Sequence, residues 1–135
     1  MLRIFRSLSG VAIGLLIALS LQAHPLEGSW QLVSGKIITD GVTTDYAEAK
    51  MQGIKVIAGN HFSFSSHNSE GFYAAAAGKI IIGGDSYAEI PIYASYPPMI
   101  GETYQFRFTV DGDIWEKLRY EQDELVEREI WQRLP

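Results

Sequence analysis

The sequence predicts a single all-β domain, built as an antiparallel sandwich or an up-and-down barrel. Tight-turn signals, in which glycine stands beside Asp or Asn, separate apolar runs at Gly59-Asn60, Gly83-Gly84-Asp85 and Asp111-Gly112-Asp113. Turns of this kind between apolar or aromatic runs are the strongest short-range indication of β-hairpins. The runs also alternate in polarity, so that Tyr104, Phe106 and Phe108 share one face of a strand. The 135 residues leave room for one domain.

Eight strands are expected in order along the chain, at residues 29–38, 53–58, 61–67, 72–82, 86–94, 103–110, 113–119 and 125–133. In the second of these, Ile54 and Val56 flank Lys55, which predicts a half-buried strand with the two apolar side chains toward the core. The continuous run Ile80-Ile81-Ile82 is typical of a strand buried on both faces. A closed barrel has no open edges, which suits a chain without a single cysteine.

Two segments do not follow the strand pattern. Pro97 and Pro98 cannot lie inside a strand, because neither donates to a ladder, and a short helical turn is expected at residues 97–100. Between residues 116 and 134 the spacing of the apolar side chains fits a helical stripe about as well as a strand. Periodicity therefore leaves the secondary structure of the C-terminal segment open.

Residues 1–23 have the pattern of a secretory signal peptide helix, which leaves residues 24–135 as the mature domain. Arg3 and Arg6 form a basic start, the stretch from Leu8 to Leu21 is almost wholly apolar, and Ala23 offers a small residue for cleavage. The apolar stretch is shorter than the roughly 20 residues that a membrane-spanning helix needs. Leu21 is a poor residue three positions before the cut, so an uncleaved anchor is the alternative. The expected location is the periplasm or the exterior.

Charge and motif content exclude several classes of function. Cleavage removes two arginines and no acid, so the net charge changes from −5 to −7, and nucleic acid is not an expected partner. No membrane span is expected after cleavage. The sequence contains no phosphate-binding glycine loop, no zinc-protease motif and no serine-hydrolase elbow, so no cofactor is expected. Nothing in the sequence places His61 or His67 near His24, so a copper site at these histidines is not predicted.

Several short motifs, in order, resemble those of the bacterial lipocalin-like domain family, a group of calycin-like β-barrels. The motifs are Gly28-Ser29-Trp30, Lys55-Val56-Ile57, His61-Phe62-Ser63-Phe64, Gly84-Asp85-Ser86-Tyr87-Ala88-Glu89, Gly101-Glu102-Thr103-Tyr104, Gly112-Asp113-Ile114-Trp115 and Glu129-Ile130-Trp131-Gln132-Arg133. The resemblance covers residues 26–134. It implies an eight-stranded antiparallel up-and-down lipocalin-like barrel, with a strand from about Leu125. Ile90, Pro91 and Ile92 depart from the family, which leaves open whether a neighbour or a partner covers the outer face of that strand.

The resemblance also implies a structural contact between Trp30 and Arg133, in which the guanidinium lies over the indole and closes the barrel floor. Strand parity places a set of aromatic and acidic side chains on faces that would line the interior: Tyr87, Glu89, Tyr93, Tyr104, Phe106 and Glu129. Such a lining fits a small amphipathic ligand. The alternative is a filled core in which tyrosines satisfy the two carboxylates. Acid–base chemistry by Glu89 and Glu129 is less favoured, and no catalytic residue or metal ligand is assigned.

The leading hypothesis is an exported binding protein for a small apolar or amphipathic ligand. The runner-up is an interaction or stability module with a solid core, whose outer face near Ile90 and Ile92 meets a partner. A small-barrel isomerase or cyclase is a third possibility, so enzymatic activity is left open and not favoured. The state of the interior discriminates between these hypotheses, because a cavity favours binding and a filled interior favours the module.

Overall fold

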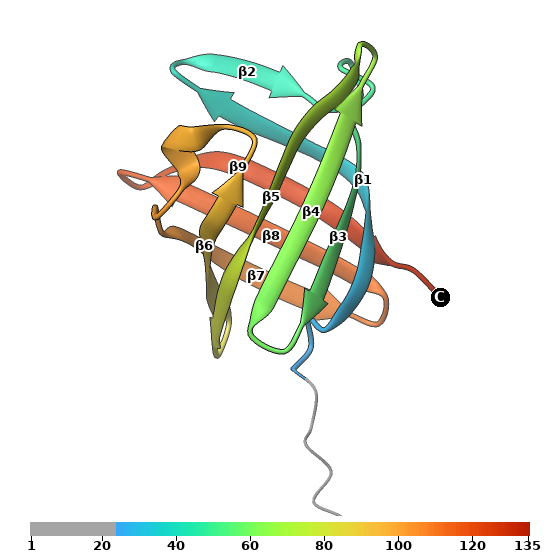
Figure 1. The fold of residues 1–135 in the computed structure, drawn as a ribbon, viewed down its shortest axis with the longest axis vertical. Coiled ribbons are helices and arrows are strands. Elements are labelled where there is room, and N and C mark those ends of the chain that lie inside the picture. The colour runs from blue at the N-terminus through green and yellow to red at the C-terminus, as the bar shows by residue number, and fades with distance from the viewer. Residues whose placement is uncertain (1–23) are drawn as a thin grey trace, which may run out of the picture.

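A computed structural model of the protein describes residues 24–135, which form a closed, eight-stranded antiparallel up-and-down barrel (Figure 1). The strands are β1 (Gly28–Thr39), β2 (Val42–Asp45), β3 (Gln52–Ala58), β4 (His61–Asn68), β5 (Gly71–Gly83), β6 (Ser86–Ala94), β7 (Tyr104–Asp111), β8 (Ile114–Glu121) and β9 (Glu124–Arg133), with a short helix η1 (Pro97–Met99) before β7. From β3 onward each strand pairs with the next, and β9 pairs with β1 to close the barrel. The expected all-β barrel is confirmed. The predicted signal peptide lies outside the described residues.

The eight predicted strands are all present, and β2 is an additional one. Asp40 and Gly41 have φ angles of 51° and 76°, and two positive φ angles in a two-residue loop are typical of the type I′ turn that reverses a hairpin. This turn folds β2 back on the end of β1 (Figure 1). A second such loop, at Gln122 and Asp123, leads into β9, so the C-terminal segment is a strand. No helix within residues 24–135 is long and apolar enough to cross a membrane.

The face that β3 turns inward differs from the predicted one. Lys55 is 2% exposed, whereas Ile54 and Val56 are 49% and 42% exposed. The register explains the reversal, because Lys55 pairs with Trp30 on β1 and Phe64 on β4, whose side chains belong to the barrel core. The prediction for β5 was also wrong in part, since Ile81 is 60% exposed. Prediction of the inward face from local apolar residues failed in both strands, because pairing with the neighbouring strands decides which face of a strand turns inward.

A β-bulge in β6 reverses the parity of its last residues. Ala77 pairs with Tyr93 and Gly78 pairs with Pro91, so that Ile92 is left over. An extra residue of this kind turns every following side chain to the other face. Tyr93 is consequently 75% exposed and does not line the interior, which corrects its predicted place. No sequence signal other than Pro91 marks the bulge.

Beyond Glu89, β6 has no strand partner on the side of β7. The β6–β7 ladder contains four residue pairs and ends at Glu89 and Tyr104. The segment 95–103 then runs over the free edge, where the amide of Gly101 donates to the carbonyl of Pro91 at 2.9 Å. Pro91 is tolerated because its ring nitrogen faces this side, where no ladder bond is lost. The barrel wall is therefore incomplete next to Glu89.

The bulge also requires glycine at position 78, which yields a stability prediction. A Cβ atom at Gly78 would clash with the carbonyl oxygen of Ile90 and would lie 2.8 Å from the Cα of Pro91. Since both are backbone atoms, Gly78→Ala is expected to lower the free energy of unfolding by about 1–3 kcal/mol or more, as overpacking does. Gly83→Ala is the control, because no atom lies within 4 Å of the position that its methyl group would take and its φ is not positive. Equal losses in urea-unfolding experiments would contradict the steric explanation.

Candidate functional site

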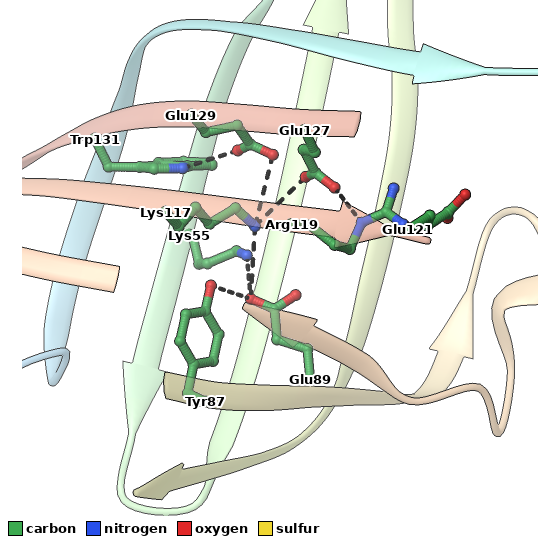
Figure 2. A network of polar contacts seen from close by, with 9 residues as sticks. All are labelled: Lys55, Tyr87, Glu89, Lys117, Arg119, Glu121, Glu127, Glu129 and Trp131. Carbon is green, nitrogen blue, oxygen red and sulfur yellow. Dashed lines mark hydrogen bonds and ion pairs between the residues drawn. The ribbon is translucent and has the colours of Figure 1, made fainter. Parts of the chain in front are cut away.

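Charged side chains from four strands meet inside the barrel and form a cluster (Figure 2). We refer to Lys55, Glu89, Lys117, Glu127 and Glu129 as the charged cluster. All five side chains point inward from β3, β6, β8 and β9, and none is more than 8% exposed. Because charges removed from water are costly unless they are paired, the contacts inside this cluster decide what it can do.

The pairing inside the charged cluster is uneven. Lys55 Nζ donates to Glu89 Oε1 at 2.5 Å, and the hydroxyl of Tyr87 donates to the same oxygen at 3.4 Å. Lys117 Nζ lies 3.5 Å from Glu129, 3.7 Å from Glu127 and 4.0 Å from Glu89. These three distances exceed the 2.7–3.2 Å typical of an N–H···O hydrogen bond. Lys117 is therefore surrounded by carboxylates, and its three donors make no short hydrogen bond with them.

The two glutamates of β9 are held from opposite sides. Trp131 Nε1 donates to Glu129 Oε2 at 2.8 Å, and Arg119 Nε donates to Glu127 Oε2, also at 2.8 Å. Arg119 extends the network outward, because its Nη1 donates to Glu121 at 2.5 Å and the Glu121 side chain is 64% exposed. Figure 2 shows this line of contacts from Glu129 to Glu121. The charged cluster thus reaches solvent on the side of Arg119.

The two β9 carboxyl groups differ in protonation. Burial raises the pKa of Glu129 to about 8 against the attraction of Lys117, and the nearby Glu127 adds to the rise. Burial acts in the same direction on Glu127, but Lys117, together with hydrogen bonds from Glu129 and Arg119, outweighs it and brings the pKa to about 2. Two carboxyl groups beside one ammonium cannot both ionise easily. Of the two, Glu129 is therefore the harder to ionise, because burial and the neighbouring Glu127 both raise its pKa.

The lysines are stabilised by aromatic rings as well as by carboxylates. Lys55 Nζ lies 5.3 Å from the ring centre of Phe64 and 5.4 Å from that of Trp131, and Lys117 Nζ lies 4.0 Å above Phe106. Cation–π contacts of this kind contribute most when the cation is shielded from water. Burial lowers the pKa of Lys55, and Glu89 opposes that effect. The rings replace part of the hydration that the ammonium groups lose.

One end of the barrel, where the chain enters, is closed by packed aromatic side chains. Trp30 and Trp115 are fully buried with ring centres 5.3 Å apart, and Tyr87 stacks on Phe106 at 5.0 Å. The indole Nε1 of Trp115 has no hydrogen-bond acceptor among residues 24–135, although buried donors are nearly always paired. The closed end is therefore packed like a filled core, in which the indole N–H of Trp115 is a donor without an acceptor.

The other end, beyond the charged cluster, has several inward side chains that are only partly buried. Phe64 on β4 pairs with Ala76 on β5, and Ala76 pairs with Ala94 on β6, which places three inward positions side by side. Phe64, Ala94 and Tyr104 are only partly buried. Tyr46, from the turn after β2, packs against Gly35 at the same end, where a Cβ atom would lie 2.6 Å from its ring. Solvent therefore reaches this open end.

The six predicted lining residues lie at four different places in the structure. Tyr87 and Phe106 lie in the packed core, Glu89 and Glu129 belong to the charged cluster, and Tyr104 is half-buried at the open end. Tyr93, as described above, lies outside. The structure thus brings Glu89, Glu129 and Phe106 together around Lys117, which sequence analysis did not single out.

Sequence analysis missed the basic half of the cluster and one acid. The pattern of β3 placed Lys55 on the outer face of the strand, and neither Lys117 nor Glu127 was a candidate. The signal that could have found them is the alternation of side chains along a strand, in which residues two positions apart point to the same face. Lys117 lies two residues after Trp115, and Glu127 lies two residues before Glu129. Glu127 therefore had to share a strand face with Glu129, which was already placed inside, and Lys117 had to share one with the apolar Trp115.

Trp30 and Arg133 touch at the closed end. They are cross-strand partners in the β1–β9 ladder, and the guanidinium carbon lies 4.2 Å from the centre of the indole. The guanidinium also donates to the carbonyls of Glu27 and Pro25, at 2.5 Å and 3.0 Å, while the indole donates to Leu26 at 2.9 Å. These bonds fasten the segment before β1 across the floor of the barrel.

Two of the hollows on the described surface lie mainly against outward-facing side chains. A groove of about 370 Å³ follows β9 and the β1–β2 hairpin, with Ile38, Val126 and Ile130 in its lining. A shallower hollow of about 430 Å³ lies over β5, β6 and the start of β7. Among residues 24–135, no group of three His, Cys, Asp or Glu side chains has an arrangement that could hold a metal ion.

Comparisons with known proteins give a likeness of fold. No protein-family model matches the chain, and no curated protein is similar enough to count as a match. Among solved structures, a redesigned β-barrel superposes with a TM-score of 0.51, at 19% sequence identity, over 82% of this chain and 93% of the designed one. A sequence identity this low supports a similarity of fold and nothing beyond it. The chain is therefore an eight-stranded antiparallel β-barrel, similar in fold to a designed barrel.

Proposed function

We propose that this barrel binds a small amphipathic molecule at its open end, with the charged cluster receiving the polar group of the ligand. One observation carries the proposal: a set of buried charges lies between a packed aromatic floor and an end whose inward side chains, Phe64, Ala94 and Tyr104, are only partly buried. Replacing buried ion pairs by apolar side chains is often neutral or stabilising, so the fold alone does not require such a cluster. Perturbed, buried titratable groups that border an accessible space are characteristic of binding sites.

The aromatic residues divide between the floor and the open end. Tyr87 and Phe106 form the floor beneath the charged cluster, whereas Tyr104 and Phe64 would contact the apolar part of the ligand. A ligand at this end would gain about 25 cal/mol for each Å² of apolar surface that leaves water. The resemblance to lipocalin-like domain proteins, through the ordered motifs from Trp30 to Arg133, forms part of the same proposal.

The test is a titration of residues 24–135 with the neutral fluorescent probe N-phenyl-1-naphthylamine. We expect saturable binding of one probe per chain, since neutral apolar probes report the apolar space without involving charge. Ala94→Trp, which places a large side chain inside the open end, should weaken binding about tenfold, equivalent to about 1.4 kcal/mol. Ala77→Trp is the matched control, because Ala77 faces outward beside Tyr93. Equal effects of the two variants would contradict the proposed location.

The second candidate is an interaction module with no ligand in its interior. The packed floor favours it, as do Ile92 and Val33 on the outer surface, which are 41% and 57% exposed. If the folded wild-type domain binds no apolar probe, the carrier hypothesis is abandoned in favour of this one.

We also propose that the protein acts outside the cytoplasm, in the periplasm or beyond it. The support is the signal-like pattern of residues 1–23, with its basic start, short apolar stretch and Ala23. N-terminal sequencing of the exported protein should begin at His24. Recovery of the intact chain from the membrane fraction would instead indicate an uncleaved anchor.

A further inference from the structure

We propose that the outer face of the wall β3–β6 is a contact surface on which a second copy of this chain docks, forming a weak two-fold dimer. The inference goes beyond the proposed function, because it concerns the outside of the barrel and stands whether or not the interior holds a ligand. It follows from the lack of charge on this face, from the distribution of side-chain sizes across it, and from the way those sizes pair under a two-fold axis.

Eight outward side chains form this surface, which we call the uncharged face. They alternate along the chain with inward residues such as Lys55, Phe64 and Ala76, which are buried or pack against the core. The strands β3, β4, β5 and β6 run side by side (Figure 1), and their registers arrange the eight side chains in two rows across the wall. One row is Val56, Ser63, Ala77 and Tyr93, and the other is Ile54, Ser65, Ala75 and Ser95, the last of which follows β6 directly.

Charged side chains lie mainly on other parts of the barrel surface. Within β3–β6 the charged residues are Lys55, Lys79 and Glu89, and of these three only Lys79 points outward. The outer side of β7–β9, in contrast, carries charged side chains such as Arg107 and Arg128. The whole chain has a net charge of −5, so two copies repel each other when they approach in most orientations. Contact through the uncharged face places no like charges opposite one another, which favours this face for self-association.

Side chains on the uncharged face are small on the two central strands and larger on the flanking strands. β4 and β5 contribute serine and alanine, whereas β3 contributes Ile54 and Val56, and β6 contributes Tyr93, which is 75% exposed. Because the wall of a closed barrel is convex, two such walls approach most closely at their central strands and diverge toward the sides. Small central side chains allow the close approach, and the larger flanking side chains fill the widening gap. The uncharged face therefore fits another wall of the same curvature.

The two rows complement each other when a second copy is laid face to face on the first. An isologous interface uses the same patch on both copies, and a two-fold axis that lies between the rows, perpendicular to the strands, sets each row against the other row of the second copy. Tyr93 of each copy then lies over the small Ser95 of the other. On the opposite flank Val56 meets Ile54, so that apolar side chains face each other there.

The two ends of the uncharged face match in the same way. Lys79, two residues beyond Ala77, lies at one end of β5, and Phe72, which is 61% exposed, lies at the other end of that strand. Because the axis reverses the direction along each strand, it brings Lys79 of one copy toward Phe72 of the other. An ammonium group near the face of an aromatic ring is attracted to it. The outward charge of Lys79 thus meets a ring and not a second ammonium.

The size of the contact predicts a weak dimer. With strands about 4.8 Å apart and residues about 3.3 Å apart, the contact is about 14 Å wide across the four strands and about 23 Å long from Lys79 to Phe72. An area of this size is smaller than the roughly 800 Å² per partner of a standard stable complex. We therefore expect a dissociation constant on the order of 100 μM. At the low micromolar concentrations of an unfolding experiment the chain would then be monomeric.

The test is sedimentation equilibrium of residues 24–135 from low micromolar to millimolar concentration, in which the mean mass should rise toward that of two chains. Ser65→Glu should raise the dissociation constant at least tenfold, because it places a carboxylate without a partner inside the contact. Gln105→Glu is the matched control, since it adds the same charge to the outer, exposed side of β7, and it should change the dissociation constant less than twofold.

A mixture of two variants tests the two-fold arrangement. The axis sets Ser63 of one copy against Ser65 of the other, so Ser63→Lys alone should also weaken the dimer at least tenfold. An equimolar mixture of Ser63→Lys and Ser65→Glu should associate within about threefold of the wild type, because the lysine then faces the glutamate. Near-ultraviolet circular dichroism checks that each variant folds. Amide chemical shifts of the wild type on dilution need no variant, and they should change in β4 and β5 more than in β7–β9.

Three results would count against the dimer. A chain that stays monomeric at millimolar concentration would overturn the proposal, and any occupant of the uncharged face would then be a different molecule. A dimer that responds equally to Ser65→Glu and Gln105→Glu would have its interface elsewhere, which also overturns the proposal. If the wild type dimerises but the mixture of the two charged variants does not, the two-fold arrangement is wrong.

Discussion

Replacing Trp30 with alanine is expected to lower the free energy of unfolding by about 3–5 kcal/mol, the range typical of a fully buried tryptophan. The indole is 0% exposed, packs edge-on against Trp115 at 5.3 Å and lies under the guanidinium of Arg133. Its removal opens a cavity at the closed end and also deprives Leu26 of a hydrogen bond. Urea unfolding followed by far-ultraviolet circular dichroism measures the loss. Tyr93→Ala, at a 75% exposed position, is the control and should change stability by less than about 0.5 kcal/mol.

A double-mutant cycle then isolates the contact between the two side chains. Arg133→Ala alone should cost about 1–2 kcal/mol, in line with a cation–π contact and its accompanying hydrogen bonds. Because the guanidinium lies on the indole, the double variant should lose less than the sum of the single losses. Strict additivity would show that the two side chains are energetically independent despite their proximity.

Replacing Lys55 with methionine is expected to cost about 3–5 kcal/mol at neutral pH, because it leaves a buried carboxylate without its closest partner. Glu89 then retains only Lys117, at 4.0 Å, and the hydroxyl of Tyr87. Lys79→Met, on the exposed face of β5, is the matched control and should be nearly neutral. The loss is measured by urea unfolding at a series of pH values.

The sign of the pH dependence follows from Glu89. In the wild type, Lys117 and Lys55 outweigh burial and hold the pKa of Glu89 below its usual value, so this carboxylate stabilises the fold at neutral pH and loses that contribution as the pH falls through its folded pKa. In the variant the ionised form is poorly compensated, and protonation relieves it. The difference between wild type and variant should therefore shrink as the pH falls, beginning above the ordinary pKa of glutamate, which is about 4.3, and continuing below it. Lys55→Met combined with Glu89→Gln should recover most of the loss at neutral pH. A deficit that persists in the double variant would indicate a packing defect instead.

The sequence predicted the barrel because turns and alternation are local properties. The Asn-, Asp- and Gly-containing loops between period-two runs determine where hairpins reverse, and eight strands followed from them. The resemblance resolved the C-terminal segment, where periodicity was ambiguous. β2 escaped notice because Val42–Asp45 is short and its turn at Asp40-Gly41 lies beside a longer strand.

The site was less predictable because it depends on which face each strand turns inward. Glu89 and Glu129 were found through parity with neighbouring aromatics, but Lys55 was placed outside because Ile54 and Val56 form an apolar pair of opposite parity. Only the register with Trp30 and Phe64 decides between those two faces. Tyr93 was misplaced for a related reason, since a bulge is a property of two strands together. Inward-facing charges contradict the usual apolar pattern of a core, and sites of function are where such contradictions are expected.

The early end of the β6–β7 ladder has a consequence for how the folded barrel fluctuates. Glu89 and Tyr104 form its last pair, and the residues of β6 beyond them are bonded on one side only by the loop 95–103. Local opening starts where backbone hydrogen bonds are fewest and apolar contacts are sparse. Amide hydrogens along this seam should therefore exchange with solvent earlier than those of the long β4–β5 ladder. Each such opening would bring water to the carboxylate of Glu89 without unfolding the aromatic floor. Amide hydrogen exchange between β6 and the loop 95–103 and hydration of the interior charges would then report the same local opening.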